Sequence, residues 1–226
     1  MSSHFAGLDL RRQRSSLWLC ALVTVFLASI VPTIGRAVDS DVSLPRQQLL
    51  GHPQARFPLR IFAPPLSDPA LEAAVHNAVA QWNVVFKQAL GKIAFIWAKQ
   101  QEEADIVLSF PPRRAGHLMG ETYLDADSQG VIRLPVKIDI SPPASRGKTA
   151  ASQVVFDVVA HELGHALGLP HSSSPTSIMC CEPGTINFND AKVRAAYLAA
   201  RRHPDLRTAI PELRQRYQRF WKQFPG

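Results

Sequence analysis

The sequence predicts an α+β fold, and its hydrophobic pattern and composition carry that prediction. Short β-branched or aromatic stretches alternate with two longer segments whose apolar residues recur at helical spacing, and another helical segment follows near the carboxyl end. The chain has 226 residues, of which 46% are apolar and 19% charged, so it can bury one core and is neither a disordered tail nor a disulfide miniprotein. Twelve Gly and eighteen Pro without a repeating period exclude collagen-like and solenoid architectures.

The first predicted elements are a strand over residues 59–62 and a helix that begins at Asp68 and Pro69. Asp is a preferred N-cap, and Pro is tolerated in the first turn, where its missing N–H is not needed. The apolar residues of this helix share one face at 3.6-residue periodicity: Leu71, Ala74, Val75, Ala78, Val79, Trp82 and Val85. This face predicts packing on a sheet, with Trp82 in the core.

Four further stretches predict strands, because they are short, β-branched or aromatic, and end at turn residues: 93–97, 104–110, 122–123 and 136–140. Trp97, in the first of them, is expected in the core. A second, strongly apolar helix is predicted over residues 152–167, and a closing helix begins at Asn189 or Asp190.

The formal charge of +7 is unevenly distributed along the chain. Residues 1–37 hold four Arg and one Asp, residues 38–191 hold twelve basic and fifteen acidic side chains, and residues 192–226 hold nine basic and two acidic ones. Because the central body is mildly acidic, the positive charge comes from the two ends, and no nucleic-acid partner is expected.

Residues 1–37 have the layout of a signal peptide. Three Arg (Arg11, Arg12 and Arg14) precede an apolar run over residues 17–31, and small residues follow at 35–37. This run is short for a bilayer core of about 30 Å, so we expect cleavage, with an uncleaved membrane anchor as the alternative. The expected location is secreted, extracellular or periplasmic, or membrane-anchored if the leader stays.

Three segments are expected after the leader. Residues 38–57 are polar and proline-punctuated and predict a linker or short pro-region, and residues 58–200 form the folded domain. Residues 201–226 predict a basic helical tail with three apolar residues near one helical face: Leu213, Tyr217 and Phe220. Such a helix either docks on its own domain or contacts a membrane surface or an acidic partner.

The second predicted helix contains the residues that carry chemistry. His161 and His165 are four positions apart, so both imidazoles can point at one metal ion from one helical face. Glu162 lies next to that face, where its carboxylate can act on a metal-activated water without being a ligand. Gly168 lets the backbone leave the helix, so that His171 can return as a third ligand.

Residues 161–171 resemble the extended zinc motif of the metzincins, H-E-x-x-H-x-x-G-x-x-H, and Met179 matches the Met-turn that follows it. Residues 104–106 and Tyr197 make the chain most similar to a small bacterial matrixin-type catalytic domain. The resemblance implies a twisted mixed five-stranded sheet with two main helices and a C-terminal helix. It also implies a zinc cleft between two subdomains, with Met179 as a hydrophobic floor beneath the ligands.

The resemblance further implies a zinc metalloendopeptidase with one catalytic Zn²⁺ held by His161, His165 and His171, and with Glu162 as the general base. The expected partner is a protein or peptide substrate that lies along an exposed edge strand near residues 120–124. The protein is expected to be a monomer.

The chain departs from the matrixin pattern in its cysteines and in one loop. Residues 38–150 contain no cysteine, so the cysteine-switch latency of many matrixins is absent. The loop over residues 111–130 is shorter than one that holds structural zinc and calcium, which are therefore not expected. Its remaining candidate ligands are His117, Asp125 and Asp127. Cys180 and Cys181 are open to being free thiols, a vicinal ring or a bond to another chain.

The sequence leaves two alternatives open. Glu182, seventeen residues after His165, could replace His171 as the third ligand, although Gly168 favours the histidine. The chain could also be a catalytically silent metzincin-fold binding protein, recruited to a membrane or partner through its basic tail. The intact Glu162 argues against this second alternative.

Overall fold

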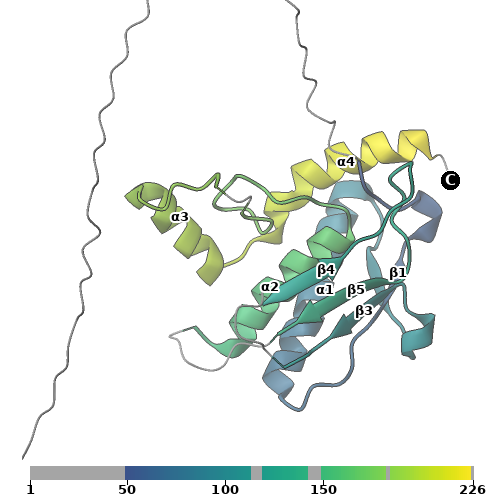
Figure 1. Cartoon of the computed structure of the whole chain (residues 1–226), viewed down its shortest axis with the longest axis horizontal. Coiled ribbons are helices and arrows are strands. Elements are labelled where there is room, and N and C mark those ends of the chain that lie inside the picture. Colours follow the sequence, from purple (N-terminus) through teal and green to yellow (C-terminus); the bar gives the residue numbers. More distant parts are fainter. Residues whose placement is uncertain (1–48, 113–118, 142–148, 182–183, 225–226) are drawn as a thin grey trace, which may run out of the picture. The chain divides into compact units, whose positions relative to one another are not determined.

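The computed structural model describes residues 49–112, 119–141, 149–181 and 184–224 (Figure 1). Its five strands are β1 (Leu59–Phe62), β2 (Phe95–Trp97), β3 (Ile106–Ser109), β4 (Gly120–Tyr123) and β5 (Val136–Ile140). They form one sheet in the order β2-β1-β3-β5-β4, in which β4 is antiparallel to β5 and the other neighbours are parallel. The predicted mixed five-stranded sheet is therefore confirmed.

Four α-helices accompany this sheet in the described part of the chain: α1 (Pro69–Leu90), α2 (Ala151–Ala166), α3 (Ala191–Arg202) and α4 (Ile210–Gln223). The predicted α+β class, with two main helices and a C-terminal helix, is confirmed. The expected leader over residues 1–37, His117 and Glu182 lie outside the described residues. None of the helices among the described residues has the length and apolar character needed to span a bilayer.

Helix α1 begins and ends as its sequence predicts. The Asp68 carboxylate accepts the N–H of Ala70 at 2.8 Å, and Gly91 ends the helix with a positive φ of 73°. Its apolar face is buried, and Trp82 donates from Nε1 to the Ala160 carbonyl of α2 at 2.8 Å. This contact ties the two main helices together within the core.

Trp97 corrects the sequence-based expectation, because it is 39% exposed rather than buried. It lies on β2, the edge strand, where Phe95 faces the core and the two residues after it face solvent. Its ring stacks on His76 of α1, with ring centroids 4.3 Å apart. An apolar strand at a sheet edge therefore need not bury every large side chain.

Both ends of the described chain pack against the C-terminal end of α2. His52 donates from Nε2 to the Ala166 carbonyl at 2.9 Å, and the Tyr217 hydroxyl of α4 donates to the Leu167 carbonyl at 3.1 Å. Trp221 joins the two ends by donating from Nε1 to the His52 carbonyl at 3.0 Å. These bonds satisfy carbonyls that the end of an α-helix leaves without a partner.

The segments on either side of the predicted domain take part in its core. The linker predicted over residues 38–57 and the tail predicted over 201–226 both contribute to the core, through Phe57 and through Leu206 and Leu213. The apolar face of α4, which could have met a membrane, is instead buried on its own domain. The described residues fall within one compact unit.

We expect His52 to make the folded state sensitive to acid. Burial lowers its pKa from 6.5 to about 4, although the Ala166 carbonyl and Asp105 favour the protonated form and Arg56 opposes it. The unfolded chain therefore binds a proton more readily, so the stability from neutral His52 is complete above pH 6.5 and is lost as pH falls towards 4. Between pH 7 and 5 the expected loss is about 2 kcal/mol.

Urea unfolding at pH 7, 6 and 5 measures this loss. The variant His52→Gln keeps an N–H donor for the Ala166 carbonyl and does not titrate, so its stability should change less across that range than the stability of the native chain. All other ionisable groups are common to both proteins. Parallel pH dependences in the two proteins would refute the assignment to His52.

Candidate metal centre

The structure brings His161, His165 and His171 together around one point. The two Nε2 atoms of His161 and His165 are 3.1 Å apart, and those of His165 and His171 are 3.2 Å apart. Two nitrogen ligands at 2.0–2.1 Å from a tetrahedral zinc would be about 3.3 Å apart. Among the described residues, these three histidines form the group of His, Cys, Asp or Glu side chains that could hold a metal ion.

Backbone carbonyls fix which nitrogen of each helical imidazole faces this point. His161 Nδ1 lies 2.8 Å from the Ile178 carbonyl, and His165 Nδ1 lies 2.8 Å from the Leu169 carbonyl. A carbonyl can only accept, so both Nδ1 atoms carry the proton and both Nε2 atoms present lone pairs. Two lone pairs 3.1 Å apart repel unless a cation lies between them, so the residues fit a zinc ion.

Burial keeps these imidazoles in the neutral form that binds metal. It lowers the pKa of His161 to about 4, and it lowers the pKa of His165 in the same direction. The hydrogen bonds to Ile178 and Leu169 act against this shift, but burial is the larger cause in both cases. Both side chains are therefore available as ligands at neutral pH.

Gly168 produces the chain reversal that returns the third histidine. Its φ is +82°, and its N–H bonds to the His165 carbonyl at 2.7 Å. A Cβ at this position would lie 2.5 Å from the Leu50 carbonyl oxygen, so the approach of the N-terminal segment also requires glycine. The backbone then runs through Leu169, whose carbonyl orients His165.

Met179 lies buried beneath helix α2, against Gly164 between the two helical histidines. A Cβ at Gly164 would overlap its Sδ, so the missing side chain makes room for the methionine. The Met179 carbonyl also accepts the N–H of Ser172 at 2.8 Å. The turn that carries Met179 thus supports both the helix and the segment that holds His171.

Glu162 lies beside the histidines with its carboxylate against strand β4. It is 6% exposed, and its Oε2 accepts the Thr122 hydroxyl at 2.6 Å. Burial raises its pKa, whereas the Thr122 hydrogen bond lowers it. A Cβ at Gly120 would lie 2.5 Å from both Glu162 Oε1 and Val158 Cγ1, so glycine permits the close packing of β4 on α2.

The sequence did not indicate Thr122 as the partner of Glu162, nor the carbonyls that orient the histidines. Thr122 is 40 residues from Glu162, and the only local signal was Gly120, the glycine that allows the approach. His161 and Ile178 are 17 residues apart. Contacts that arise when distant segments pack leave no periodic pattern in a sequence.

The other predicted candidates lie outside the histidine cluster. Asp125 is exposed and pairs with Arg133 at 3.3 Å, and Asp127 Oδ1 accepts the N–H of Val131 at 2.9 Å. Cys180 and Cys181 are joined in a vicinal disulfide, one of the three states that the sequence leaves open.

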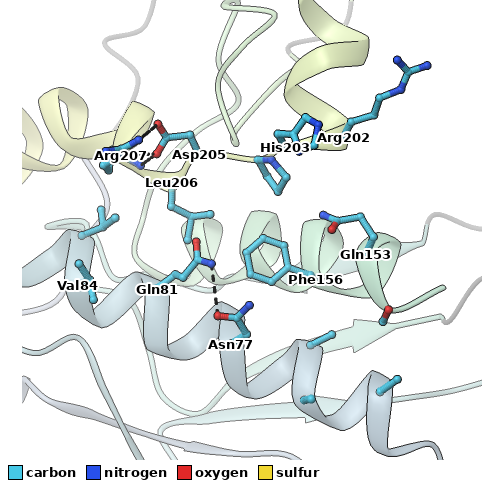
Figure 2. A pocket seen from close by; sticks show the side chains of 16 residues that line it. Asn77, Gln81, Val84, Gln153, Phe156, Arg202, His203, Asp205, Leu206 and Arg207 are labelled. Carbon is cyan, nitrogen blue, oxygen red and sulfur yellow. Dashed lines mark hydrogen bonds and ion pairs between the residues drawn. The ribbon is translucent and has the colours of Figure 1, made fainter. Parts of the chain in front are cut away.

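A groove of about 890 Å³ lies apart from the metal centre, between α1, the first half of α2 and residues 202–207 (Figure 2). Phe156 and Leu206 lie on its apolar part, and Asp205 is paired with Arg207 at 2.8 Å. The described residues that line it include neither the three histidines nor Glu162. The groove is therefore separate from the metal chemistry.

Fold and site together define the class of the protein. Three convergent imidazoles are a ligand set typical of a catalytic zinc ion, and strand β4, at the edge of the mixed sheet, packs on the helix that carries two of them. This arrangement is that of a metzincin-type catalytic domain. The chain belongs to the matrixin family, whose model matches residues 54–194.

Neutrophil collagenase of Homo sapiens is similar to this chain. It is 27% identical, in an alignment that covers 54% of this chain and 26% of the collagenase. The matched part thus corresponds to about a quarter of the human protein.

Replacing the third histidine tests the ligand set. We expect His171→Ala to lose most of its zinc affinity, because removing it leaves two imidazoles, whereas Glu182→Ala should keep the metal. Zinc content after gel filtration, and a dissociation constant from competition with a chelator, measure both. Full zinc binding by His171→Ala together with loss in Glu182→Ala would assign the third ligand to the glutamate.

Proposed function

We propose that the protein is an exported zinc-dependent metalloendopeptidase that hydrolyses peptide bonds of proteins, with Glu162 as the general base. The observation that carries the proposal is a buried carboxylate, Glu162, held by Thr122 next to three convergent imidazoles. A zinc ion bound by His161, His165 and His171 would polarise the scissile carbonyl and acidify water. The remaining steps belong to the residues of the chain.

Glu162 would move the proton. Its carboxylate would accept a proton from the attacking water and later deliver it to the departing amine. Burial raises its pKa, which makes the carboxylate a stronger base than that of an exposed glutamate. The Thr122 hydroxyl, which donates to Oε2 at 2.6 Å, opposes this shift and holds the carboxylate in one orientation.

Strand β4 is suited to bind the substrate backbone. It ends the sheet, so that one of its sides has no strand neighbour within the described sheet. Gly120 and Thr122 face α2, as their contacts with Glu162 show. A peptide added along this edge would gain main-chain hydrogen bonds that tolerate many sequences, and it would lie beside the metal centre.

Export rests on the sequence of the leader, and the vicinal disulfide is consistent with it. Disulfides persist in oxidising compartments and are rare in the cytosol. The Cys180–Cys181 pair therefore fits a protein that acts outside the cytosol. Recovery of a chain shortened by about 37 residues from the culture medium or periplasm would support this part of the proposal.

The second candidate, a silent binding protein recruited by its tail, finds less support. It needs an accessible apolar face on the tail helix, whereas Leu213, Tyr217 and Phe220 are buried. It also leaves unexplained why a carboxylate is kept beside the histidines at 6% exposure.

Hydrolysis of a mixed peptide library by the native chain and by Glu162→Gln tests the proposed function. Both proteins should bind one zinc, because Glu162 is not among the converging ligands. The variant should cleave about 10²- to 10⁴-fold more slowly, which is the usual contribution of a general base. Glu102→Gln, an exposed glutamate in another part of the chain, serves as the control. Equal cleavage by native and Glu162→Gln proteins would reject the role of Glu162.

A further inference from the structure

The Met-turn, residues 177–180, is the backbone segment on which the metal centre rests. Its Ile178 carbonyl accepts the Nδ1–H of His161 at 2.8 Å. Its Met179 carbonyl accepts the N–H of Ser172 at 2.8 Å, in the segment that carries the third histidine. A shift of this turn would move two of the three imidazoles, so what holds the turn also holds the site.

Two side chains beyond the matched family region hold this turn. Arg201, in the last turn of α3, donates from Nη2 to the Ser177 carbonyl at 2.7 Å. Thr208, in the short 3-10 helix η3 (Leu206–Ala209), accepts the N–H of Ile178 on Oγ1 at 3.3 Å. The two contacts fall on consecutive residues of the turn, immediately before the carbonyl that orients the first histidine.

We propose that Arg201 and Thr208 are positioning residues of the metal centre. They set the place of the Ile178 carbonyl, and through it the direction of the His161 Nε2 lone pair. Both act through the backbone of the turn. The inference rests on the proposed function only in taking His161 as a metal ligand.

The surroundings of Arg201 fix its guanidinium. The group lies over the Tyr197 ring, 5.6 Å from its centroid. Its positive charge also acts on Asp157 of α2. Burial raises the pKa of Asp157 to about 6, and the charge of Arg201 opposes that rise. A hydrogen bond from a charged donor is about twice as strong as a neutral one, so Arg201 is the stronger of the two supports.

Thr208 is oriented by a second bond. Its hydroxyl donates to the Asp205 carbonyl at 2.7 Å, which leaves an oxygen lone pair for the Ile178 N–H. The Asp205 side chain is itself held by Arg207, as Figure 2 shows. The Thr208 acceptor is therefore oriented by its own bond to the Asp205 carbonyl.

The test compares zinc affinity and ligand geometry in full-length variants. We expect Arg201→Met to raise the zinc dissociation constant about tenfold, the lower end of the range for residues that support metal ligands. Thr208→Val should raise it less, because its contact is longer and uncharged. Arg201→Lys, which keeps a charged donor, and Thr208→Ser, which keeps the hydroxyl, should restore most of the affinity. Arg202→Met is the matched control, because it removes the same charge from an exposed neighbour on α3.

Cobalt(II) substitution gives the second readout. The visible absorption of bound cobalt reports the arrangement of its ligands, so it should shift in Arg201→Met and not in Arg202→Met. If Arg201→Met only destabilised the fold, its unfolding temperature would fall, and Arg201→Lys would not restore the cobalt spectrum. If Arg201→Met does not fold, the comparison of Thr208→Val with Thr208→Ser tests the proposal instead.

Each outcome separates this inference from the proposed function. Unchanged zinc affinity and cobalt spectra in folded Arg201→Met and Thr208→Val would overturn it, whatever the peptidase assay gives. Weaker zinc binding in both variants would support it, even if the native chain cleaved no peptide in the library.

Discussion

Two hydrogen bonds from imidazole Nδ1 atoms to backbone carbonyls are the interactions on which the rest of the site depends. They fix the tautomers of His161 and His165 and turn both Nε2 lone pairs to one point. Neither carbonyl belongs to α2 itself: one comes from the chain reversal after Gly168, and the other from the Met-turn. Helix spacing alone therefore brings the rings to one face but does not aim them.

Aiming the rings requires that the end of α2 and the two segments after it keep their places. The last carbonyls of the helix receive donors from His52 and Tyr217, which lie near opposite ends of the described chain. Gly168 permits Leu50 to approach, and Trp221 then closes the contact by binding the His52 carbonyl. The short motif works because segments distant from it in sequence supply the donors that its backbone needs.

Features that depend on neighbouring residues are predictable from the sequence. Asp68 and Pro69 mark the start of α1, and the short β-branched stretch over residues 136–140 predicts β5, because caps and strand preferences act over a few residues. Trp97 was misplaced because composition does not tell an edge strand from a central one. His52 and Ala166 are 114 residues apart, so no local pattern could have paired them. The residues of the motif are recognisable in the sequence, whereas the partners that orient them are not.

Burial has opposite effects on the protonation of the ligands and of the base. Removing the site from water favours neutral imidazoles, which bind metal, and it also favours a protonated glutamate, which cannot accept a proton. His161 and Glu162 are adjacent and share this environment, so their pKa values are moved in opposite directions from their ordinary values, downward and upward. The hydroxyl of Thr122 offsets the effect at Glu162 alone, because it donates to the carboxylate and reaches no ligand nitrogen. The Thr122 hydroxyl on the edge strand thus acts on the base without acting on the ligands.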